Sequence, residues 1–303
     1  MPLGVNGVEE RLLEATVRLT AAAESLAALA AHLRVVTEGV EVDPEIGALL
    51  ASIAAQVVGD APLDPSEPAA QSIGMTRALL AEALSLVDNP ARVGDWSATD
   101  PAVLQGLGRI SMSIAPVIAA AATRLEGLDQ RLQAPGAAVL DVGTGTGWLA
   151  LALAATFPAA RVVGIDLFEP ALALARTNVA SHPAGHRVEI RAGDVRDLDD
   201  TDTYDAVWLP LPFLPREVVV EAARRAFRAL RPGGWVLPGT FAGPDNPLGQ
   251  LLTELRIRRS GGYPWSADAL HRVLGAAGFD DAVELARTWA APVRLHAARR
   301  PTP

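Results

Sequence analysis

The feature that most restricts the fold of this chain is a run of alternating glycines, Val139-Leu-Asp-Val-Gly-Thr-Gly-Thr-Gly-Trp148. An apolar strand-like segment leads directly into Gly143, Gly145 and Gly147, and a helical pattern over 149–157 follows. Glycines remove the Cβ atoms that would keep a ligand away from the main chain, and the first turn of a helix presents free N–H groups. The run therefore predicts a strand–turn–helix unit that binds a polar or anionic group.

The sequence from Ala134 onward alternates short β-rich runs with helical stretches. This pattern is typical of βαβ units with a parallel sheet. We expect an α/β fold with a doubly wound, mostly parallel sheet of seven strands. The predicted strands are Ala138–Val142, Arg161–Asp166, Arg187–Ala192, Ala206–Leu209, Gly234–Pro238, Ala282–Thr288 and Arg294–Ala298.

The glycine spacing alone leaves the ligand open. Gly145-Thr-Gly-Trp-Leu-Ala150 fits the G-x-G-x-x-G/A pattern of dinucleotide sites, and Asp166 follows Gly147 by 19 residues at the end of the next predicted strand. By spacing, NAD is therefore one possible ligand.

Other residues along the chain narrow the choice of ligand. An acid, Asp141, precedes the glycines, and Val162-Val-Gly-Ile-Asp166 ends the second strand in a carboxylate. Arg191-Ala-Gly-Asp194-Val195, Tyr204-Asp-Ala-Val-Trp-Leu-Pro210 and Leu230-Arg-Pro-Gly-Gly-Trp235 follow in order. From about residue 134 to residue 301 the series resembles the class I S-adenosylmethionine (SAM)-dependent methyltransferases, which have a Rossmann-like sheet. The resemblance implies SAM as the cofactor.

The resemblance also implies roles for individual residues. Asp166 is expected to accept hydrogen bonds from both ribose hydroxyls, Asp194 to face the adenine amine, and the main-chain N–H of Val195 to meet the adenine ring. Asp141 is expected either to orient the glycine turn or to approach the methionine amine. The complete set of predicted cofactor-binding residues is Asp141, Gly143, Thr144, Gly145, Gly147, Asp166, Leu167, Asp194, Val195 and Leu209.

Residues before Ala134 show no strand pattern. Helical segments are expected at 8–37, 44–58, 67–87 and 101–132, so we place a helical N-terminal domain at 1–133 and the SAM-binding domain at 134–303. In the first segment, leucines recur every seven residues at Leu12, Leu19, Leu26 and Leu33, with Ala15, Ala22, Leu29 and Val36 between them. This seam predicts either packing inside one subunit or a homodimer. By resemblance, such helices cover the acceptor pocket and form dimer surfaces.

Composition excludes several classes. The chain has no cysteine, which excludes thiolate metal sites and disulfides. All 26 basic residues are arginine, which excludes a lysine Schiff base or P-loop. A net charge of −9 disfavours a nucleic-acid partner. With no basic leader and no apolar run near the ~18 residues of a membrane span, we expect a cytoplasmic protein without a membrane partner.

The acceptor side is predicted from aromatic and arginine residues that follow the later strands. Pro210-Leu-Pro-Phe213 follows strand four but lacks the leading Asp or Asn of the motif that amino methyltransferases use. The candidates for an apolar acceptor wall are Trp208, Pro210, Phe213, Phe241, Tyr263 and Trp265. For Trp208, packing in the core is the favoured interpretation. Arg256, Arg258 and Arg259 are interpreted as a solvated helix face, with an anionic acceptor as the alternative. In the helical region, Asp95-Trp96-Ser97 is a candidate cap of the cofactor cleft, and the glycines of 106–108 would allow close helix contacts.

No catalytic base is predicted. His182 and His186 are expected at the surface, and His271 and His296 in structural positions. The histidines and acids do not follow a known metal-ligand spacing, so we expect no metal. The favoured function is methyl transfer from SAM to a small molecule by direct displacement, and we expect a homodimer. The alternatives are an NAD-dependent oxidoreductase and a non-catalytic SAM-binding protein.

Overall fold

The structure is a computed structural model that describes residues 5–59, 67–94 and 100–302. The chain divides into two compact units, Met1–Asp88 and Asn89–Pro303, which we call the N-terminal unit and the sheet unit. The helices between residues 101 and 133 therefore pack with the sheet, although their sequence resembles that of the preceding helices. The predicted division at 133/134 was placed where the strand pattern begins, and it stays a prediction.

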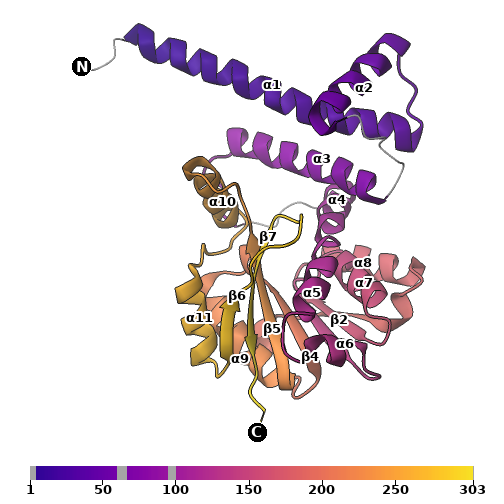
Figure 1. Cartoon of the computed structure of the whole chain (residues 1–303), viewed down its shortest axis with the longest axis vertical. Helices are drawn as coiled ribbons and strands as arrows, with labels where there is room; N and C mark the ends of the chain where they lie inside the picture. The colour runs from indigo at the N-terminus through magenta and orange to yellow at the C-terminus, as the bar shows by residue number, and fades with distance from the viewer. Residues whose placement is uncertain (1–4, 60–66, 95–99, 303) are drawn as a thin grey trace. The chain divides into compact units, whose positions relative to one another are not determined.

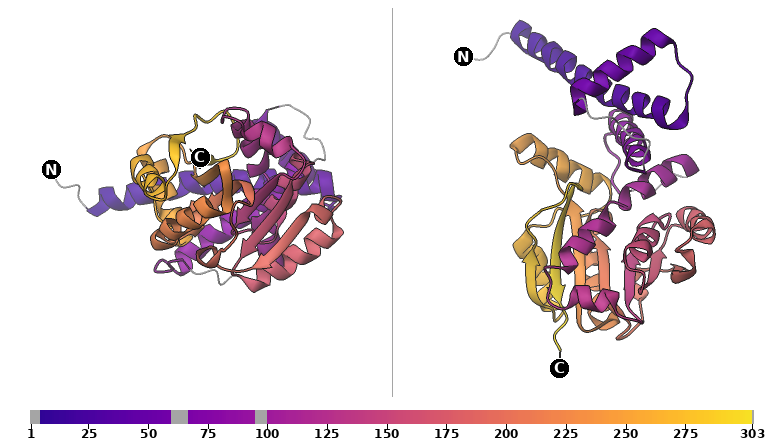
Figure 2. Two further views of the ribbon diagram at one scale, coloured as in Figure 1. Left: turned by 90° about the horizontal axis from the view of Figure 1, so that it is seen from below. Right: turned by 45° about the vertical axis from the view of Figure 1, so that its right-hand side comes forward.

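The sheet unit is built on seven strands in the order β3-β2-β1-β4-β5-β7-β6. Strands β1 to β5 pair in parallel and β7 pairs antiparallel with both β5 and β6. This confirms the predicted doubly wound, mostly parallel sheet, which Figures 1 and 2 show between its helices. The strands are β1 (Ala138–Val142), β2 (Arg161–Asp166), β3 (Val188–Ala192), β4 (Tyr204–Pro210), β5 (Leu230–Phe241), β6 (Asp280–Glu284) and β7 (Val293–Arg299).

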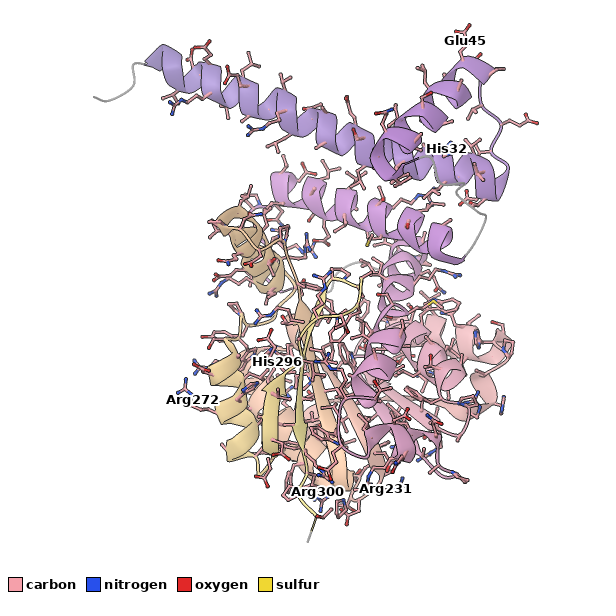
Figure 3. All side chains as sticks on the ribbon, in the orientation of Figure 1. His32, Glu45, Arg231, Arg272, His296 and Arg300 are labelled. Atoms are coloured by element: carbon pink, nitrogen blue, oxygen red, sulfur yellow. The ribbon has the colours of Figure 1, made fainter. Side chains whose placement is uncertain are left out.

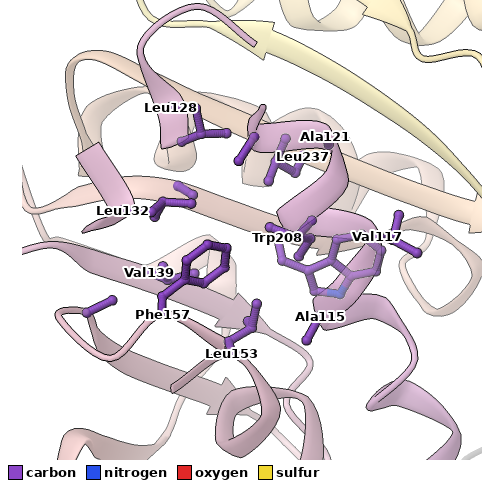
Figure 4. Packing of buried hydrophobic residues seen from close by; sticks show 14 of the residues in the cluster. Ala115, Val117, Ala121, Leu128, Leu132, Val139, Leu153, Phe157, Trp208 and Leu237 are labelled. Atoms are coloured by element: carbon purple, nitrogen blue, oxygen red, sulfur yellow. The ribbon is translucent and has the colours of Figure 1, made fainter. Parts of the chain in front are cut away.

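Helices cover both faces of the sheet. The helices are α4 (Pro101–Ser111), α5 (Ile114–Ala122), α6 (Leu128–Gln133), α7 (Trp148–Thr156), α8 (Glu169–Ser181), α9 (Arg216–Ala229), α10 (Pro247–Arg259) and α11 (Ala267–Ala276), with short 3-10 turns η1 (Gly185–Arg187), η2 (Val195–Asp197) and η3 (Leu211–Phe213). One buried cluster joins α5, α6 and α7 to the sheet (Figure 4). A second joins α9 and α11 to the other face. Because both faces are covered, β1 and β4 are buried along their whole length.

A buried carboxylate organises the amino end of the sheet. Asp205 on β4 accepts from the main-chain N–H of Ala138 at 3.0 Å and forms salt bridges with Arg131 of α6 and Arg231 of β5. Three partners compensate the cost of burying one negative charge. Helix α6 is thereby fixed to the sheet. Figure 3 labels Arg231 and, near it, Arg300.

The N-terminal unit consists of α1 (Val5–Glu38), α2 (Pro44–Val58) and α3 (Glu67–Asp88). Asp43 caps α2, because its carboxylate accepts from the N–H groups of Glu45 and Ile46, and Pro44 occupies the first turn. The unit's small core contains Leu33, Ala69 and Ile73, with Leu29 packed against it. The second half of the leucine seam is therefore used inside the subunit. In the first half, Leu12 and Leu19 are 68% and 60% exposed.

Two stretches are long and apolar enough to cross a membrane by length and composition. They are Val8–Glu38 and Pro101–Ala122, so the expectation that no stretch approaches this length is wrong. The second stretch combines α4 and α5, and α5 is a core helix because Val117, Ile118 and Ala121 are buried against the sheet. Core helices satisfy the same criterion, so the expectation of no membrane partner stays a prediction.

Most predicted elements agree with the observed ones. The helical segment predicted at 101–132 is instead three helices. The break between α5 and α6 includes Gly127, which has φ +74°. Helix α5 ends earlier, at Ala122, and the left-handed Gly127 is the residue directly before α6, where it turns the chain into that helix.

Candidate functional site

The glycine turn lies where β1 ends, at the carboxyl edge of the sheet. Gly143, Gly145 and Gly147 all have positive φ, at +66°, +55° and +80°. A Cβ on Gly143 would lie 3.1 Å from the ring of Pro210, and one on Gly147 would lie 3.2 Å from Ala175. A Cβ on Gly145 would meet no described atom within 4 Å. Gly145 is therefore the glycine whose main chain is open to a ligand, whereas the other two allow the turn to pack.

Asp141 and Thr144 hold this turn from beneath. Thr144 Oγ1 donates to Asp141 Oδ2 at 2.7 Å, and the Thr144 N–H donates to the carbonyl of Ile165 at 3.0 Å. Thr144 lies over Gly164, where a Cβ would be 2.5 Å from the threonine hydroxyl. Asp141 is only 1% exposed. Burial, with a smaller contribution from the nearby charge of Asp166, raises the pKa of Asp141 to about 7.

Asp166 connects the ends of β1 and β2. Its Oδ2 accepts from the Gly145 N–H at 2.7 Å and its Oδ1 accepts from the Phe168 N–H at 2.8 Å. Burial raises the pKa of Asp166, and the hydrogen bonds to main-chain N–H groups oppose that rise. Each carboxylate oxygen has a second lone pair. The side chain can therefore hold the turn and still accept from a diol.

The remaining predicted residues lie at neighbouring strand ends. Asp194 precedes η2 and accepts from the main-chain N–H and the guanidinium of Arg196, which holds the pKa of Asp194 below its usual value. Val195 is buried, whereas Leu167 is 68% exposed beside Asp166. The side chain of Leu209 is buried in the core shared with α9 and α11. Only the main chain of Leu209 is therefore available to a ligand at this edge.

Helix α4 is clamped onto the glycine turn. Gln105 Oε1 accepts from Trp148 Nε1 at 2.6 Å and from Asn178 Nδ2 at 3.1 Å, and Gln105 Nε2 donates to Asn178 Oδ1 at 2.9 Å. Asn178 Nδ2 also donates to the carbonyl of Thr146 within the turn, at 2.8 Å. This network joins α4, α7 and α8 around the loop that would carry the cofactor.

The clamp requires a glycine on α4. A Cβ on Gly108 would lie 1.9 Å from Thr146 Oγ1 and 3.1 Å from the Trp148 ring. The expected close helix contact is therefore present at Gly108. The Arg109 guanidinium lies 4.2 Å from the centre of the Trp148 ring. Sequence reasoning missed Gln105 and Asn178, whose pairing spans 73 residues of sequence and leaves no local signal.

The acceptor-wall candidates separate into two groups. Phe213 and Phe241 meet edge to face at 5.7 Å at the carboxyl ends of β4 and β5, and the Arg256 guanidinium lies 5.8 Å from the Phe241 ring. Trp208 packs in the core, as favoured, with its ring over Gly239. Tyr263 and Trp265 pack on the opposite face of the sheet with α9 and α11. Phe213 and Phe241 are thus the wall candidates that contact each other at the carboxyl ends of the strands. The candidate cap Asp95-Trp96-Ser97 lies outside the described residues.

The three arginines of α10 do not form one solvated face. Arg259 is buried, and its guanidinium donates to the carbonyls of Asn89 and Arg92. The interpretation as a solvated face is therefore wrong for Arg259, which fixes the start of the sheet unit through contacts that sequence spacing does not reveal. Arg258 pairs with Glu254 on the same helix. Arg256 alone of the three approaches the aromatic pair.

The histidines of the sheet unit have structural partners. His182 Nδ1 accepts from the Ala184 N–H, and His186 hydrogen-bonds the carbonyl of Pro183. His271 Nε2 and His296 Nδ1 are 3.2 Å apart. Burial lowers the pKa of His296 to about 4 (Figure 3 labels this residue). Within 5–59, 67–94 and 100–302, His, Asp and Glu side chains form no cluster suited to a metal ion.

The site fits a nucleoside cofactor at the ends of β1 to β3. The open main chain of Gly145 and the carboxylates of Asp166 and Asp194 are available at one edge, beside the exposed Leu167. An open α/β sheet binds its ligands at this edge. The predicted cofactor residues thus come together, apart from the side chain of Leu209, although their individual roles stay predictions.

Comparison with known proteins agrees with this geometry. Residues 139–234 match the family described as "Methyltransferase domain". The chain is 36% identical over 112 residues to a malonyl-[acyl-carrier protein] O-methyltransferase of Halalkalibacterium halodurans, covering 36% of this chain and 40% of that protein. It is 32% identical over 167 residues to a carboxy-S-adenosyl-L-methionine synthase of Chromohalobacter salexigens, covering 48% and 62%. The chain thus spans less than two thirds of either relative.

Solved structures show the same fold over nearly the whole chain. An O-methyltransferase family protein from Burkholderia thailandensis has a TM-score of 0.67 at 15% identity, covering 96% of this chain and 98% of that one. Human N-acetylserotonin methyltransferase in complex with SAM has a TM-score of 0.65 at 15% identity, covering 97% and 98%. The Rossmann-like methyltransferase fold with N-terminal helices is thereby confirmed.

Proposed function

We propose, from the premise that residues 139–234 form a methyltransferase domain, that the chain transfers a methyl group from SAM to a small organic molecule. The observation that carries the proposal is the glycine turn. Its open residue, Gly145, donates its main-chain N–H to the Asp166 carboxylate. The similarity of the chain to methyltransferases supports methyl transfer over the NAD-dependent oxidoreductase and over a non-catalytic role.

The residues at the strand ends would bind different parts of the cofactor. Asp166 would accept from the ribose hydroxyls, and Asp194 with the Val195 N–H would meet the adenine. Gly145 would let the cofactor approach the main chain, while Thr144 and Asp141 keep the turn in place. When bound, SAM supplies a methyl group on a positively charged sulfur. The main contribution of the protein to rate is then the alignment of the two reactants.

The acceptor side supports an apolar or aromatic small molecule. Phe213 and Phe241 offer an aromatic surface at the carboxyl ends of β4 and β5, and Arg256 adds a positive charge beside it. The histidines described in the sheet unit all have other partners or are buried. We therefore propose an acceptor that needs little proton removal by the protein, such as a carboxylate or another readily ionised nucleophile.

Titration calorimetry with SAM and with S-adenosylhomocysteine tests the cofactor proposal. Asp166→Ala should weaken binding by at least about tenfold, because a hydrogen bond to a charged group contributes about 1.5–3 kcal/mol. Asp166→Asn, which keeps an acceptor oxygen, should lose less. Asp197→Ala, at an exposed acid on η2, should bind like the parent. Binding of NAD with no response to SAM would overturn the proposal, and turnover of labelled SAM with an acceptor panel tests catalysis.

A homodimer through α1 completes the proposal. The first half of the leucine seam is exposed in the N-terminal unit, at Leu12 and Leu19, and an exposed apolar stripe of this spacing fits a second helix. The proposal also keeps a cytoplasmic location without nucleic-acid or membrane partners, supported by the net charge of −9 as far as nucleic acid is concerned.

Light scattering tests the dimer with a matched pair of variants. Leu12→Gln with Leu19→Gln should convert the dimer to a monomer, because both substitutions place polar groups in the seam. Leu13→Gln with Val17→Gln changes two equally exposed apolar residues outside the seam and should leave the mass unchanged. If the seam variant keeps the mass of a dimer, α1 packs only within its own subunit.

A further inference from the structure

A groove between α9 and α11 lies on the face of the sheet that no step of the proposed reaction uses. It has a volume of about 210 Å³. Arg216, Val220 and Arg224 line it from α9, Arg272 and Val273 line it from α11, and Trp265 lies just before α11. The first three residues are spaced four apart and so form one helix face. The groove thus has apolar side chains between three guanidinium groups.

The charges of the groove are only partly balanced. Salt bridges pair many arginines of this acidic chain, including Arg161, Arg191 and Arg294. In the described part of the chain, neither Arg216 nor Arg272 has a carboxylate within salt-bridge distance. Arg224 has only Glu221, which it shares with Arg225. No acidic residue is among the groove's lining. The groove therefore presents net positive charge.

Trp265 adds a buried aromatic side chain to the lining of the groove. It is 8% exposed, and its indole Nε1 is buried without a hydrogen-bond acceptor. An indole N–H can only donate, and burying it unpaired costs free energy. The Arg216 guanidinium lies 6.0 Å from the Trp265 ring and 5.2 Å from the Tyr263 ring. Trp265 and Tyr263 therefore place two aromatic rings beside Arg216.

We propose that this groove binds a small organic anion with an apolar body, such as an aromatic carboxylate. Arg216 and Arg272 would hold the carboxylate, and Trp265, Val220 and Val273 would contact the apolar body. Figure 3 labels Arg272. Guanidinium groups suit a carboxylate because they present parallel donors. The apolar residues between the arginines favour an organic anion over inorganic phosphate.

The site is separate from the cofactor edge but adjoins the loop that precedes α11. Trp265 ends the segment Gly261–Trp265, and a Cβ on Gly262 would lie 2.4 Å from the carbonyl of Pro212 in η3. That loop therefore packs directly against the segment after β4. The groove's occupant would contact one end of this loop through Trp265.

Titration calorimetry on the full chain with 1-naphthoate tests the proposal. The variants are Arg216→Gln, Arg272→Gln and Trp265→Phe, which replaces the indole with a smaller ring. The matched control is Arg228→Gln, an exposed arginine of the same helix that does not line the groove. The uncharged 1-naphthalenemethanol and inorganic phosphate are titrated in parallel. Thermal melting and S-adenosylhomocysteine binding show whether each variant is folded.

The expected result is saturable naphthoate binding that weakens about tenfold in Arg216→Gln and in Arg272→Gln, the loss typical of a charged hydrogen bond. Trp265→Phe should weaken it by a few fold, and Arg228→Gln should leave it unchanged. Binding of the alcohol or of phosphate should be at least about tenfold weaker. Naphthoate binding that is absent, equal to that of the alcohol, or insensitive to both arginine variants would overturn the proposal. Because S-adenosylhomocysteine binding is measured separately, this failure would leave the proposed function intact.

Discussion

The two units of the chain differ in how completely each buries its own apolar side chains. In the sheet unit, leucines such as Leu140, Leu153 and Leu172 are fully buried between sheet and helices. In the N-terminal unit, Leu12, Leu49 and Leu84 are more than half exposed. A sheet with helices on both faces closes its core by itself, whereas three helices with one small cluster do not. The sheet unit thus buries its own core, whereas the N-terminal unit leaves many of its apolar side chains exposed.

Core truncation should give the largest difference between the units. Leu153→Ala removes a fully buried side chain of α7 (Figure 4) and should lower the free energy of unfolding by about 2–5 kcal/mol. Leu84→Ala, at a side chain 62% exposed on α3, should change it by less than about 0.5 kcal/mol. Urea denaturation measures both. A large loss at Leu84 would mean that the N-terminal unit buries this residue in an assembly, which would sharpen the comparison.

The buried acid beneath the glycine turn should make the stability of the sheet unit depend on pH. The pKa of Asp141 rises from 3.8 to about 7 on folding. As the pH rises through this window, the unfolded chain releases the proton first, so the folded state loses stability, by up to about 4 kcal/mol. Below the window both states are protonated, and no such difference remains.

Asp141→Asn removes this titration and keeps an acceptor for Thr144. The variant should match the parent near pH 4 and be the more stable protein at pH 8, as measured by urea denaturation at both values. Asp245→Asn, at an exposed acid, is the control and should show no such divergence. Parallel stability curves for the parent and Asp141→Asn would show that Asp141 ionises normally in the folded protein.

Replacing the glycine of α4 that contacts the glycine turn should lower the stability of the protein, whereas replacing an uncrowded helix glycine should raise it. Gly108→Ala places a Cβ against Thr146 Oγ1 and should cost about 1–3 kcal/mol of stability by overpacking. It should also weaken SAM binding, because Thr146 is part of the turn. Gly275→Ala on α11 meets no described atom within 4 Å and should stabilise by about 0.5–1 kcal/mol. If Gly108→Ala also stabilises, α4 is not tightly clamped.

The sheet and the strand-end carboxylates were predictable because their signals are local. An apolar run followed by alternating glycines predicts a strand and a tight turn, and the structure has these glycines at positive φ. Parallel strands then bring Asp141, Asp166 and Asp194 to the same edge of the sheet. Strands β1 and β2 were predicted with their observed bounds. The family resemblance added the cofactor, which the spacing alone left open between SAM and NAD.

The remaining features depend on contacts between residues far apart in the sequence. The pairing of Gln105 with Asn178, the burial of Arg259 under the carbonyls of Asn89 and Arg92, and the groove between α9 and α11 have no local pattern. Each arises only when separate elements pack together. The leucine seam differs, because its period was visible in the sequence. Only the structure shows that its second half is used inside the unit.

The sequence by itself thus determined the order of strands and helices, the glycine turn and the acids beside it, because backbone conformation and side-chain alternation are encoded within a few residues. Only the tertiary structure decided which arginines are buried, which glycine is open to a ligand and which helices join the sheet. Those outcomes depend on contacts between segments that are far apart in the sequence, and such contacts form only when the whole unit packs.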